Sequence, residues 1–246
     1  MRVKFELIGS NKIVLPFSHS HILQGLVYNF LEDKAADWLH SEGFKYEKRS
    51  FKMFVFSDII ERAQIDKIKR MFIFPETISF YLASPVDWIL QQAAQNLIKS
   101  EKIRLGNNVC FISSISVLKQ ELVTDNKIKV KTLSPITIHS TLQKIYGGSI
   151  TYYYSPFEKE FEELIFQNLK KKWRSLHKVR CPFNNFSIKP LFNTNRHDKI
   201  RTFKKTLIKG WAGMFELSGK KELLQFALDA GLGDRNSQGY GMVEFI

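Results

Sequence analysis

Apolar and polar side chains alternate at the start of the chain and then recur at a helical spacing. Residues 2–8 read RVKFELI, with every second side chain apolar, which is typical of a half-buried strand. The pattern then breaks, and Ser18 or Ser20 can cap the helix that the apolar residues of 22–31 indicate. A second, shorter helix is predicted over residues 34–41.

The following eighty residues predict two strands, a helix and a last strand. Residues 51–57 (FKMFVFS) alternate as a strand, and residues 70–82, rich in Phe and Ile, predict another that is broken near Pro75. A helix is expected over 84–99 and a strand over 109–118. The order strand–helix–strand–strand–helix–strand is that of a ferredoxin-like unit.

The second half of the chain repeats this order. Its predicted elements are a strand over 127–132 continued by 134–139, a helix over 157–176, strands over 183–191 and 201–216 with a hairpin around 194–199, a helix over 219–230 capped by Ser218, and a strand over 241–246. The sequence therefore predicts an α+β fold of two tandem ferredoxin-like (βαββαβ) domains, residues 1–124 and 125–246. A cleft between their two sheets would suit an extended ligand.

Composition sets the broad class of the protein. The 246 residues are 44% hydrophobic and 25% charged, as in globular proteins, and no apolar run is long enough to span a bilayer. The first ten residues do not resemble a signal peptide, and two cysteines, Cys110 and Cys181, cannot form a disulfide framework. The expectation is a cytoplasmic protein with reduced thiols.

The charge points to a polyanionic partner. Lys and Arg number 37 against 24 Asp and Glu, a net charge of +13. Residues 166–210 hold thirteen Lys or Arg and one acid, Asp198, an asymmetry that favours nucleic acid over a merely solvated basic face. An anionic membrane ranks far behind, because the sequence lacks a strongly amphipathic basic helix with an exposed apolar face.

Four glycines crowd into the segment GLGDRNSQGYG near the C-terminus. The segment is neither a dinucleotide fingerprint, since Asn236 stands at the third glycine position, nor a Walker loop. It joins the last predicted helix to the last strand, where glycine permits positive φ and lets another backbone approach. An ordinary helix-to-strand connection needs only one glycine. We therefore expect a binding loop whose polar residues are Arg235, Asn236, Ser237 and Gln238.

This ending resembles the glycine-rich signature G-h-G-x-x-x-x-x-G-h-G of repeat-associated RNA-binding proteins of CRISPR systems, with h apolar or aromatic. Among these the chain is most similar to the pre-CRISPR-RNA endoribonucleases of the Cas-six family. Three other stretches carry the same resemblance: LQGLVY at 23–28, KMFVFS at 52–57 and TLSPI at 132–136. The four marks follow the family order along the whole chain.

The resemblance implies a fold and a reaction. The family has two ferredoxin-like domains and cleaves repeat RNA in the precursor transcript (pre-crRNA) without a metal or other cofactor. The 2′-hydroxyl attacks the adjacent phosphate, which leaves a 2′,3′-cyclic phosphate and a 5′-hydroxyl. Such chemistry needs a base, an acid, positive charge on the phosphorane and an in-line geometry. Independently, no Cys/His cluster in the sequence has metal-ligand spacing.

Carried over by motif, the family's catalytic Tyr and Lys fall on Tyr28 and Lys52, and spacing places the catalytic His on His40. His40 would act as general acid or base, Lys52 would stabilise phosphorane charge, and Tyr28 would position or share the proton of the attacking hydroxyl. Lys48 or Arg49 replaces Lys52 if the strand alignment slips.

Two more histidines, His19 and His21, are expected to be structural, with an RNA contact or an alternative catalytic role left open. Trp173, Phe203 and Tyr240 either stack on bases or belong to the core. The residues expected to bind RNA are Arg201, Lys204, Lys205 and Lys209 in the basic segment and Gly231, Gly233, Arg235, Asn236, Ser237, Gly239 and Gly241 in the loop.

An alternative function in the same superfamily is a subunit that binds repeat RNA within a CRISPR effector complex without cutting it. Membership of such a complex and homodimerisation are left open by the sequence.

Overall fold

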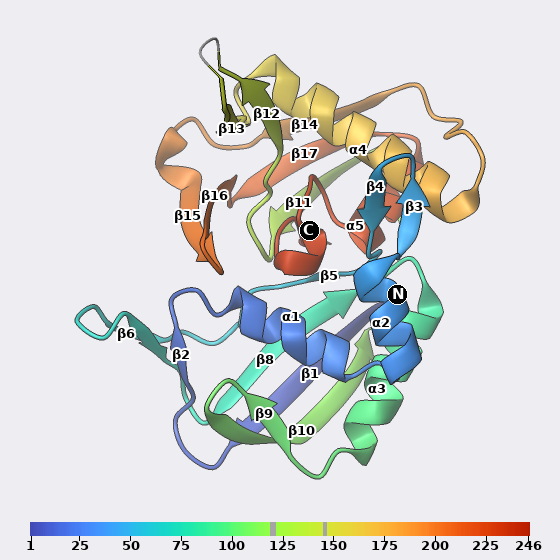
Figure 1. Cartoon of the computed structure of the whole chain (residues 1–246). Helices are drawn as coiled ribbons and strands as arrows, with labels where there is room; N and C mark the ends of the chain where they lie inside the picture. The colour runs from blue at the N-terminus through green and yellow to red at the C-terminus, as the bar shows by residue number, and fades with distance from the viewer. Residues whose placement is uncertain (119–121, 145–146) are drawn as a thin grey trace.

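The computed structural model describes residues 1–118, 122–144 and 147–246, and it contains two antiparallel sheets, one above the other in Figure 1. The lower sheet has the strand order β5-β8-β1-β10-β9. Its strands are β1 (Arg2–Gly9), β5 (Val55–Phe56), β8 (Thr77–Ala83), β9 (Ile103–Leu105) and β10 (Asn108–Leu118). Three helices accompany it: α1 (Ser20–Asn29), α2 (Asp33–Ser41) and α3 (Asp87–Lys99).

The upper sheet repeats the arrangement of the lower one. Its order is β14-β17-β11-β18, formed by β11 (Lys127–Thr132), β14 (Phe186–Pro190), β17 (Met214–Gly219) and β18 (Val243–Phe245). Helices α4 (Lys159–His177) and α5 (Lys221–Ala230) complete this unit. In both units the first and third strands of the βαββαβ order lie at the centre, flanked by the second and fourth. The two tandem ferredoxin-like units predicted from the sequence are therefore confirmed.

Each unit has its own core. Val3, Phe5 and Leu7 point from β1 into the first core, because alternate residues of a strand share a face. Phe161 and Ile165 of α4 lie in the second core. The predicted division after residue 124 lies in the connection between β10 and β11 and stays a prediction.

Smaller elements surround the two units. A three-stranded sheet consists of β2 (Val14–Pro16), β7 (Met71–Ile73) and β6 (Gln64–Asp66). Three hairpins are formed by β3 (Phe44–Tyr46) with β4 (Arg49–Phe51), β12 (His139–Gln143) with β13 (Ser149–Tyr153), and β15 (Asp198–Phe203) with β16 (Thr206–Trp211). Short 3-10 turns are η1 (Asn195–His197) and η2 (Asn236–Gln238).

The predicted strand over 51–57 is wrong as one element. Met53 has a positive φ of 53°, which interrupts the extended backbone. The strand before it, β4, pairs with β3, whereas β5 after it joins the main sheet. Likewise Pro75 separates β7 from β8, and these two strands belong to different sheets.

Three details of the second half also differ from the prediction. Residues 134–139 do not continue β11 as a strand, and the predicted strand over 201–216 is divided among β15, β16 and β17. The hairpin turns at Lys204 and Lys205 instead of around 194–199, with Lys204 at a φ of 53°.

The predicted helix caps are wrong as well. Helix α1 begins after His19, and α5 begins after Lys220, while Ser218 lies in β17. No side chain makes a capping hydrogen bond at either of these two helix starts.

The two units contact each other directly. The Arg2 guanidinium donates to the Val243 carbonyl at 2.5 Å, and Gln24 Nε2 donates to the Ser237 carbonyl at 2.7 Å. Val55 of the first unit packs with Met242 of the second in a small buried cluster. The segment 231–241, which we call the glycine loop, thereby rests on the first unit (Figure 1). Among the helices of the described residues, none is long and apolar enough to cross a membrane.

Candidate active site and glycine loop

The structure brings Tyr28, His40 and Lys52 together. Tyr28 lies in the last turn of α1, His40 near the end of α2, and Lys52 directly after β4. The rings of Tyr28 and His40 meet edge to face with centroids 5.6 Å apart. Lys52 Nζ donates to the His40 carbonyl at 2.8 Å and to Ser50 Oγ at 3.0 Å. We call these three residues the candidate set.

Buried neighbours hold this set in place. Leu39 is fully buried and anchors α2, so the next residue, His40, faces solvent. Phe54 is buried and packs edge to face on Tyr28 at 5.6 Å. The left-handed backbone at Met53 lies between Phe54 and the half-buried Lys52. The orientation of the set is thus fixed by packing within the first unit.

Burial changes the acidity of two members of the set. It raises the pKa of Tyr28 to about 12, so the phenol keeps its proton at neutral pH and can donate a hydrogen bond. Burial also lowers the pKa of Lys52. His40 has an exposed side chain, and imidazole is the side chain best suited to proton transfer near neutrality.

The two alternatives to Lys52 lie farther along the β3–β4 hairpin. Lys48 occupies its turn and Arg49 begins β4, and both are exposed. Neither makes a hydrogen bond or ion pair with Tyr28 or His40 in the described part of the chain. The contact with His40 belongs to Lys52.

A cleft of about 820 Å³ connects Lys52 with the second unit. Its walls include Arg49 and Lys52 from the first unit, His139 from β12, Lys171 from α4, and Arg235 from the glycine loop. Tyr28 and His40 do not line this cleft and lie beside it, next to Lys52. Lys52 and the glycine loop therefore border a common opening, with Tyr28 and His40 beside it.

The glycines of the loop face the protein itself. Gly231, Gly233, Gly239 and Gly241 are all buried, with φ values of 78°, 69°, 85° and 80°. A Cβ at Gly233 would overlap the Thr137 carbonyl oxygen, and one at Gly239 would lie 2.7 Å from the Phe56 ring. Only glycine combines this backbone with this closeness.

The same burial limits which loop residues can reach a ligand. Arg235, Ser237 and Gln238 keep partial exposure and line the cleft, whereas Asn236 is buried. Asn236 Nδ2 donates to the Leu232 carbonyl at 3.1 Å and to the Tyr240 carbonyl at 2.9 Å. Asn236 therefore ties the loop together from inside.

Lys172 holds the loop from α4, a role that the sequence analysis missed. Its Nζ donates to the Gly231 carbonyl at 2.7 Å and to the Gly233 carbonyl at 3.0 Å. The side chain is buried, and burial lowers its pKa to about 7. The helical spacing in the sequence could have indicated this burial, because Lys172 lies on the same face of α4 as Phe161 and Ile165.

The predicted basic binders divide into two groups. Arg201 makes a two-pronged ion pair with Asp58, at 2.5 and 2.6 Å, and Lys209 pairs with Asp198 at 3.2 Å. Lys204 and Lys205 are exposed at the β15–β16 turn, and within the described residues no carboxylate pairs with them.

The three predicted stacking aromatics pack within the protein. Phe203 and Tyr240 are buried together, and Trp173 packs against Phe183 and Phe226. His19 and His21 lie at the start of α1, each with Nδ1 near a backbone carbonyl, at 3.1 and 2.6 Å. These five side chains are thus held by protein contacts.

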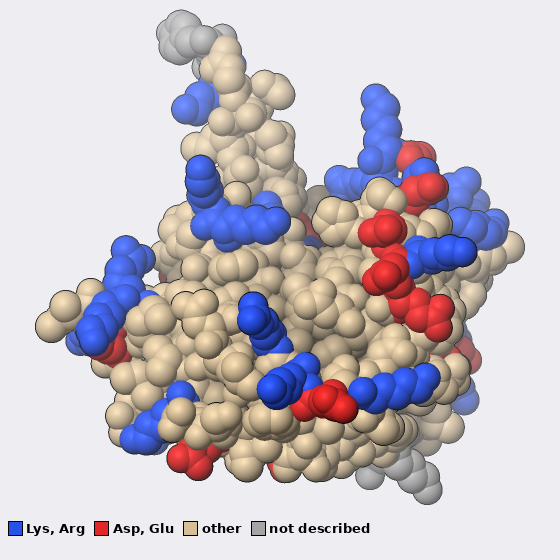
Figure 2. All heavy atoms as spheres, turned by 60° about the horizontal axis from the view of Figure 1, so that its bottom comes forward, with Lys and Arg blue, Asp and Glu red and all other residues tan. Residues whose placement is uncertain are grey.

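Charged side chains are spread over the surface of the molecule. On the face shown in Figure 2, Lys and Arg side chains lie in separate groups, with Asp and Glu between some of them. In the described residues, no three His, Cys, Asp or Glu side chains are grouped closely enough to hold a metal ion.

Comparison with known proteins identifies relatives over the full chain. The family model for CRISPR associated protein Cas6, C-terminal, matches residues 118–245, and that for CRISPR-associated protein Cas6, N-terminal, matches residues 14–116. The CRISPR-associated endoribonuclease Cas6 1 of Methanocaldococcus jannaschii is 27% identical, with 99% of this chain and 92% of the relative covered.

Two solved structures share the fold. One described as CRISPR associated protein Cas6 superposes with a TM-score of 0.80 at 27% identity, covering 100% of this chain and 99% of the other. A Cas6-related protein from Pyrococcus furiosus superposes with a TM-score of 0.86 at 21% identity, covering 100% and 98% of the two chains.

Proposed function

The chain belongs to the Cas6 family of CRISPR-associated proteins, and on that premise we propose that it cleaves CRISPR repeat RNA in the precursor transcript. The observation that carries this proposal is the meeting of Tyr28 of α1, His40 of α2 and Lys52, which follows β4. An exposed imidazole, a protonated phenol and an amine at one place supply what phosphodiester transesterification requires.

The proposed reaction is attack by the 2′-hydroxyl on the adjacent phosphate. The bond from the 2′-oxygen to phosphorus forms, the bond from phosphorus to the 5′-oxygen breaks, and the proton lost at the 2′-oxygen is matched by one gained at the 5′-oxygen. The products are a 2′,3′-cyclic phosphate and a 5′-hydroxyl. We assign proton transfer to His40, orientation of the attacking hydroxyl to Tyr28, and stabilisation of phosphorane charge to Lys52. We assign no metal or cofactor to the reaction.

RNA binding is proposed for the exposed cations and polar groups around the cleft. Arg235 and Ser237 of the loop face it, and Lys204 and Lys205 extend from the β15–β16 turn. In this proposal the four loop glycines and Asn236 shape the loop. Arg201 and Lys209, each already paired with a carboxylate, add positive charge near the RNA. Phosphate contacts of this kind weaken as salt rises.

Cleavage of the repeat RNA from the same CRISPR array, with EDTA present, tests the proposal. We expect one cut with a cyclic phosphate end, identified by mass spectrometry. A repeat with a 2′-deoxynucleotide at the mapped cleavage position should bind and resist cleavage. His40→Ala should lose about 10²–10⁴-fold in rate at unchanged affinity. His177→Ala, an exposed histidine at the end of α4, is the matched control.

Three outcomes would overturn parts of the proposal. Full activity of His40→Ala would remove His40 from the mechanism. Cleavage only with an added divalent metal would contradict the reaction as written. Tight binding of the repeat with no cleavage by the unaltered protein would instead support a non-cleaving RNA-binding subunit.

A further inference from the structure

The cleft that Lys52 borders also holds a histidine from the second unit. His139, the first residue of β12, is the one histidine that lines this cleft among the described residues, and Asp234 of the glycine loop is the one carboxylate. His139 Nδ1 lies 2.5 Å from Asp234 Oδ2. We call these two residues the His139–Asp234 pair.

Backbone and ring contacts hold this pair in place. The His139 backbone N–H donates to Asp234 Oδ2 at 3.2 Å, and the Asp234 backbone N–H donates to the Thr137 carbonyl at 2.9 Å. Tyr153 lies opposite His139 in the β12–β13 ladder, and the centroids of the two rings are 5.5 Å apart. These contacts fix the orientation of the His139 ring.

The two ring nitrogens of His139 have different surroundings. Nδ1 is buried next to the carboxylate, whereas Nε2 makes no hydrogen bond within the described residues. The side chain is 25% exposed, so the open part of the ring is the side that carries Nε2. A carboxylate at Nδ1 sets the tautomer and orients Nε2, an arrangement that prepares an imidazole for proton transfer.

The wall of the cleft makes a carboxylate informative at this place. Among the described residues, the other charged side chains that line it are cations: Arg49, Lys52, Lys171, Lys172 and Arg235. A carboxylate repels phosphate groups, so Asp234 in a wall otherwise lined by cations indicates a specific role. Orientation of His139 is the role that its contacts support.

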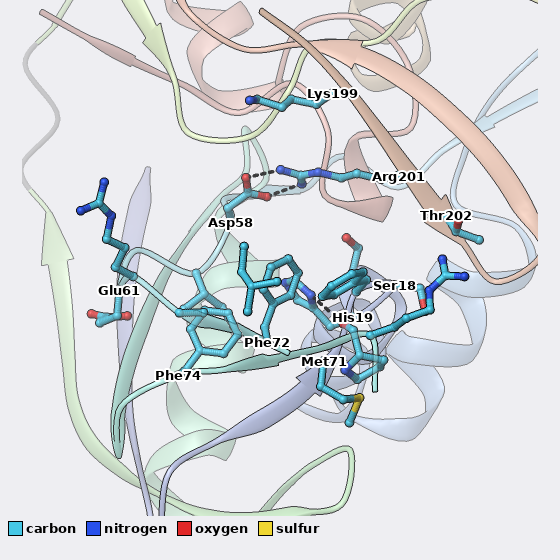
Figure 3. Close-up of a pocket in the computed structure, with 18 of the residues that line it drawn as sticks. Ser18, His19, Asp58, Glu61, Met71, Phe72, Phe74, Lys199, Arg201 and Thr202 are labelled. Carbon is cyan, nitrogen blue, oxygen red and sulfur yellow. Dashed lines mark hydrogen bonds and ion pairs between the residues drawn. The ribbon is translucent and has the colours of Figure 1, made fainter. Parts of the chain in front are cut away.

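The remaining histidines of the described structure do not line the cleft: His19, His21, His177 and His197. Figure 3 shows the His19 ring beside Phe72 and Phe74, in a separate cavity at the start of α1. His40 lies beside the cleft, next to Lys52. His40 and His139 are therefore the two imidazoles placed to act at the candidate set.

The proposed reaction needs proton transfer at two oxygens on opposite sides of phosphorus. The 2′-oxygen attacks in line with the leaving 5′-oxygen, so one side chain reaches only one of them directly. His40 lies with Tyr28, which we assign to the attacking hydroxyl, and Lys52 lies between His40 and the cleft. The group that serves the leaving oxygen is therefore expected beyond Lys52, where the wall from the second unit carries His139.

We propose that His139, oriented by Asp234, is the general acid of the cleavage reaction. This assignment rests on the function proposed above, and it leaves the 2′-oxygen to His40. As the bond from phosphorus to the 5′-oxygen breaks, the Nε2 proton of the His139 imidazolium passes to that oxygen, and His40 takes the proton of the 2′-hydroxyl. His139 is then neutral and His40 protonated, and proton exchange with water restores both.

A repeat RNA with sulfur in place of the 5′-oxygen at the mapped cleavage position tests this assignment. A thiolate leaves readily without a proton, so that substrate has little need of a general acid. On the all-oxygen repeat, His139→Ala should lose about 10²–10⁴-fold in single-turnover rate. On the sulfur-substituted repeat its rate should return to within a few-fold of the rate of the unaltered protein.

Three variants serve as comparisons. His40→Ala should stay slow on both substrates, because removal of the 2′-proton is needed in each. Asp234→Asn keeps the size of the side chain and removes its charge, so it should slow cleavage of the all-oxygen repeat less than His139→Ala and leave the sulfur substrate nearly unaffected. His177→Ala, the exposed histidine of α4, is the matched control and should cleave both at the unaltered rate.

The outcomes separate this assignment from the proposed function. If the unaltered protein cleaves the repeat while His139→Ala keeps its full rate, or loses the same factor on both substrates, His139 is not the acid and the proposed function stands. If His40→Ala alone recovers on sulfur, the acid is His40. If the unaltered protein cleaves neither substrate, the proposed function is wrong and this assignment falls with it. If His139→Ala does not fold, His139→Gln decides by the same comparison.

Discussion

The candidate set and the glycine loop are built in opposite ways, although Lys52 of the set lines the same cleft as the loop. Tyr28, His40 and Lys52 all come from the first unit, and His40 is exposed. The glycines of the loop are buried between the units, and the loop is held by Lys172 from one side and Phe56 from the other. Substitutions in the set should therefore alter chemistry at little cost to folding, whereas substitutions in the loop should alter folding first.

The largest expected effect is on the rate of cleavage. Lys52→Ala removes a cation that we place next to the phosphorane, and we expect the rate to fall about 10²–10³-fold. Within the described residues, the half-buried Lys52 makes two hydrogen bonds, so the unfolding midpoint in urea should barely move. Lys52→Arg should recover part of the rate. A rate unchanged in Lys52→Ala would shift the role to Lys48 or Arg49.

In the glycine loop the effect should fall on stability. Gly233→Ala combines a left-handed backbone with an overlap on the Thr137 carbonyl, and we expect a loss of about 3 kcal/mol in the free energy of unfolding. Urea denaturation measures it. Gly147→Ala is the control for backbone strain alone, because its φ is 90° and, among the described residues beyond its chain neighbours, no atom lies within 4 Å of the added Cβ. Equal losses of unfolding free energy at both positions would show that the contact with the Thr137 carbonyl adds nothing to the backbone strain.

Lys172 should make stability depend on pH. Below pH 7 both folded and unfolded chains carry this proton, and burial of the charge opposes folding in full. Between pH 7 and 10.5 only the unfolded chain retains it, so stability rises with pH, by up to about 1.4 kcal/mol per unit.

Urea denaturation at pH 6, 7, 8 and 9 checks this dependence. Lys172→Met should lack the rise in stability that the unaltered protein shows above pH 7. Lys170→Met, two residues earlier on α4, should keep that rise. The same pH slope in Lys172→Met as in the unaltered protein would contradict a buried amine with a depressed pKa.

The smallest effect should be on affinity alone. Lys204→Ala with Lys205→Ala removes two exposed charges, so repeat RNA should bind a few-fold more weakly, with a salt slope smaller by about 1.4. Neither the unfolding midpoint nor the single-turnover rate at saturating protein should change. Lys220→Ala with Lys221→Ala, exposed at the start of α5, is the control. An unchanged salt slope would exclude the turn from the RNA interface.

The sequence predicted the elements that have one buried face. Residues 2–8 alternate because β1 buries every second side chain, and the apolar spacing of α4 reflects its packing on the second sheet. The β12–β13 hairpin was missed because it has no such buried face. Most of its side chains are exposed on both faces, so no alternation marks it.

The parts of the site that the sequence could not predict depend on contacts between distant residues. Arg201 was expected to bind RNA, and its pairing with Asp58, 143 positions away, is set only by the packing of the two units. The loop glycines were expected to bind RNA, and the sequence could not predict that Gly233 and Gly239 pack against Thr137 and Phe56. In contrast, Tyr28 and Lys52 were named from short motifs of the family resemblance. The structure places both beside His40, although the strand predicted around Lys52 is interrupted at Met53.

Lys172 also provides a chemical reporter of loop movement. An amine enclosed by the Gly231 and Gly233 carbonyls cannot meet an acylating reagent while the loop is closed. In brief treatment of the folded protein, exposed lysines such as Lys204 should be acylated first and Lys172 last. The delay at Lys172 would then measure how often the glycine loop opens, with and without RNA in the cleft.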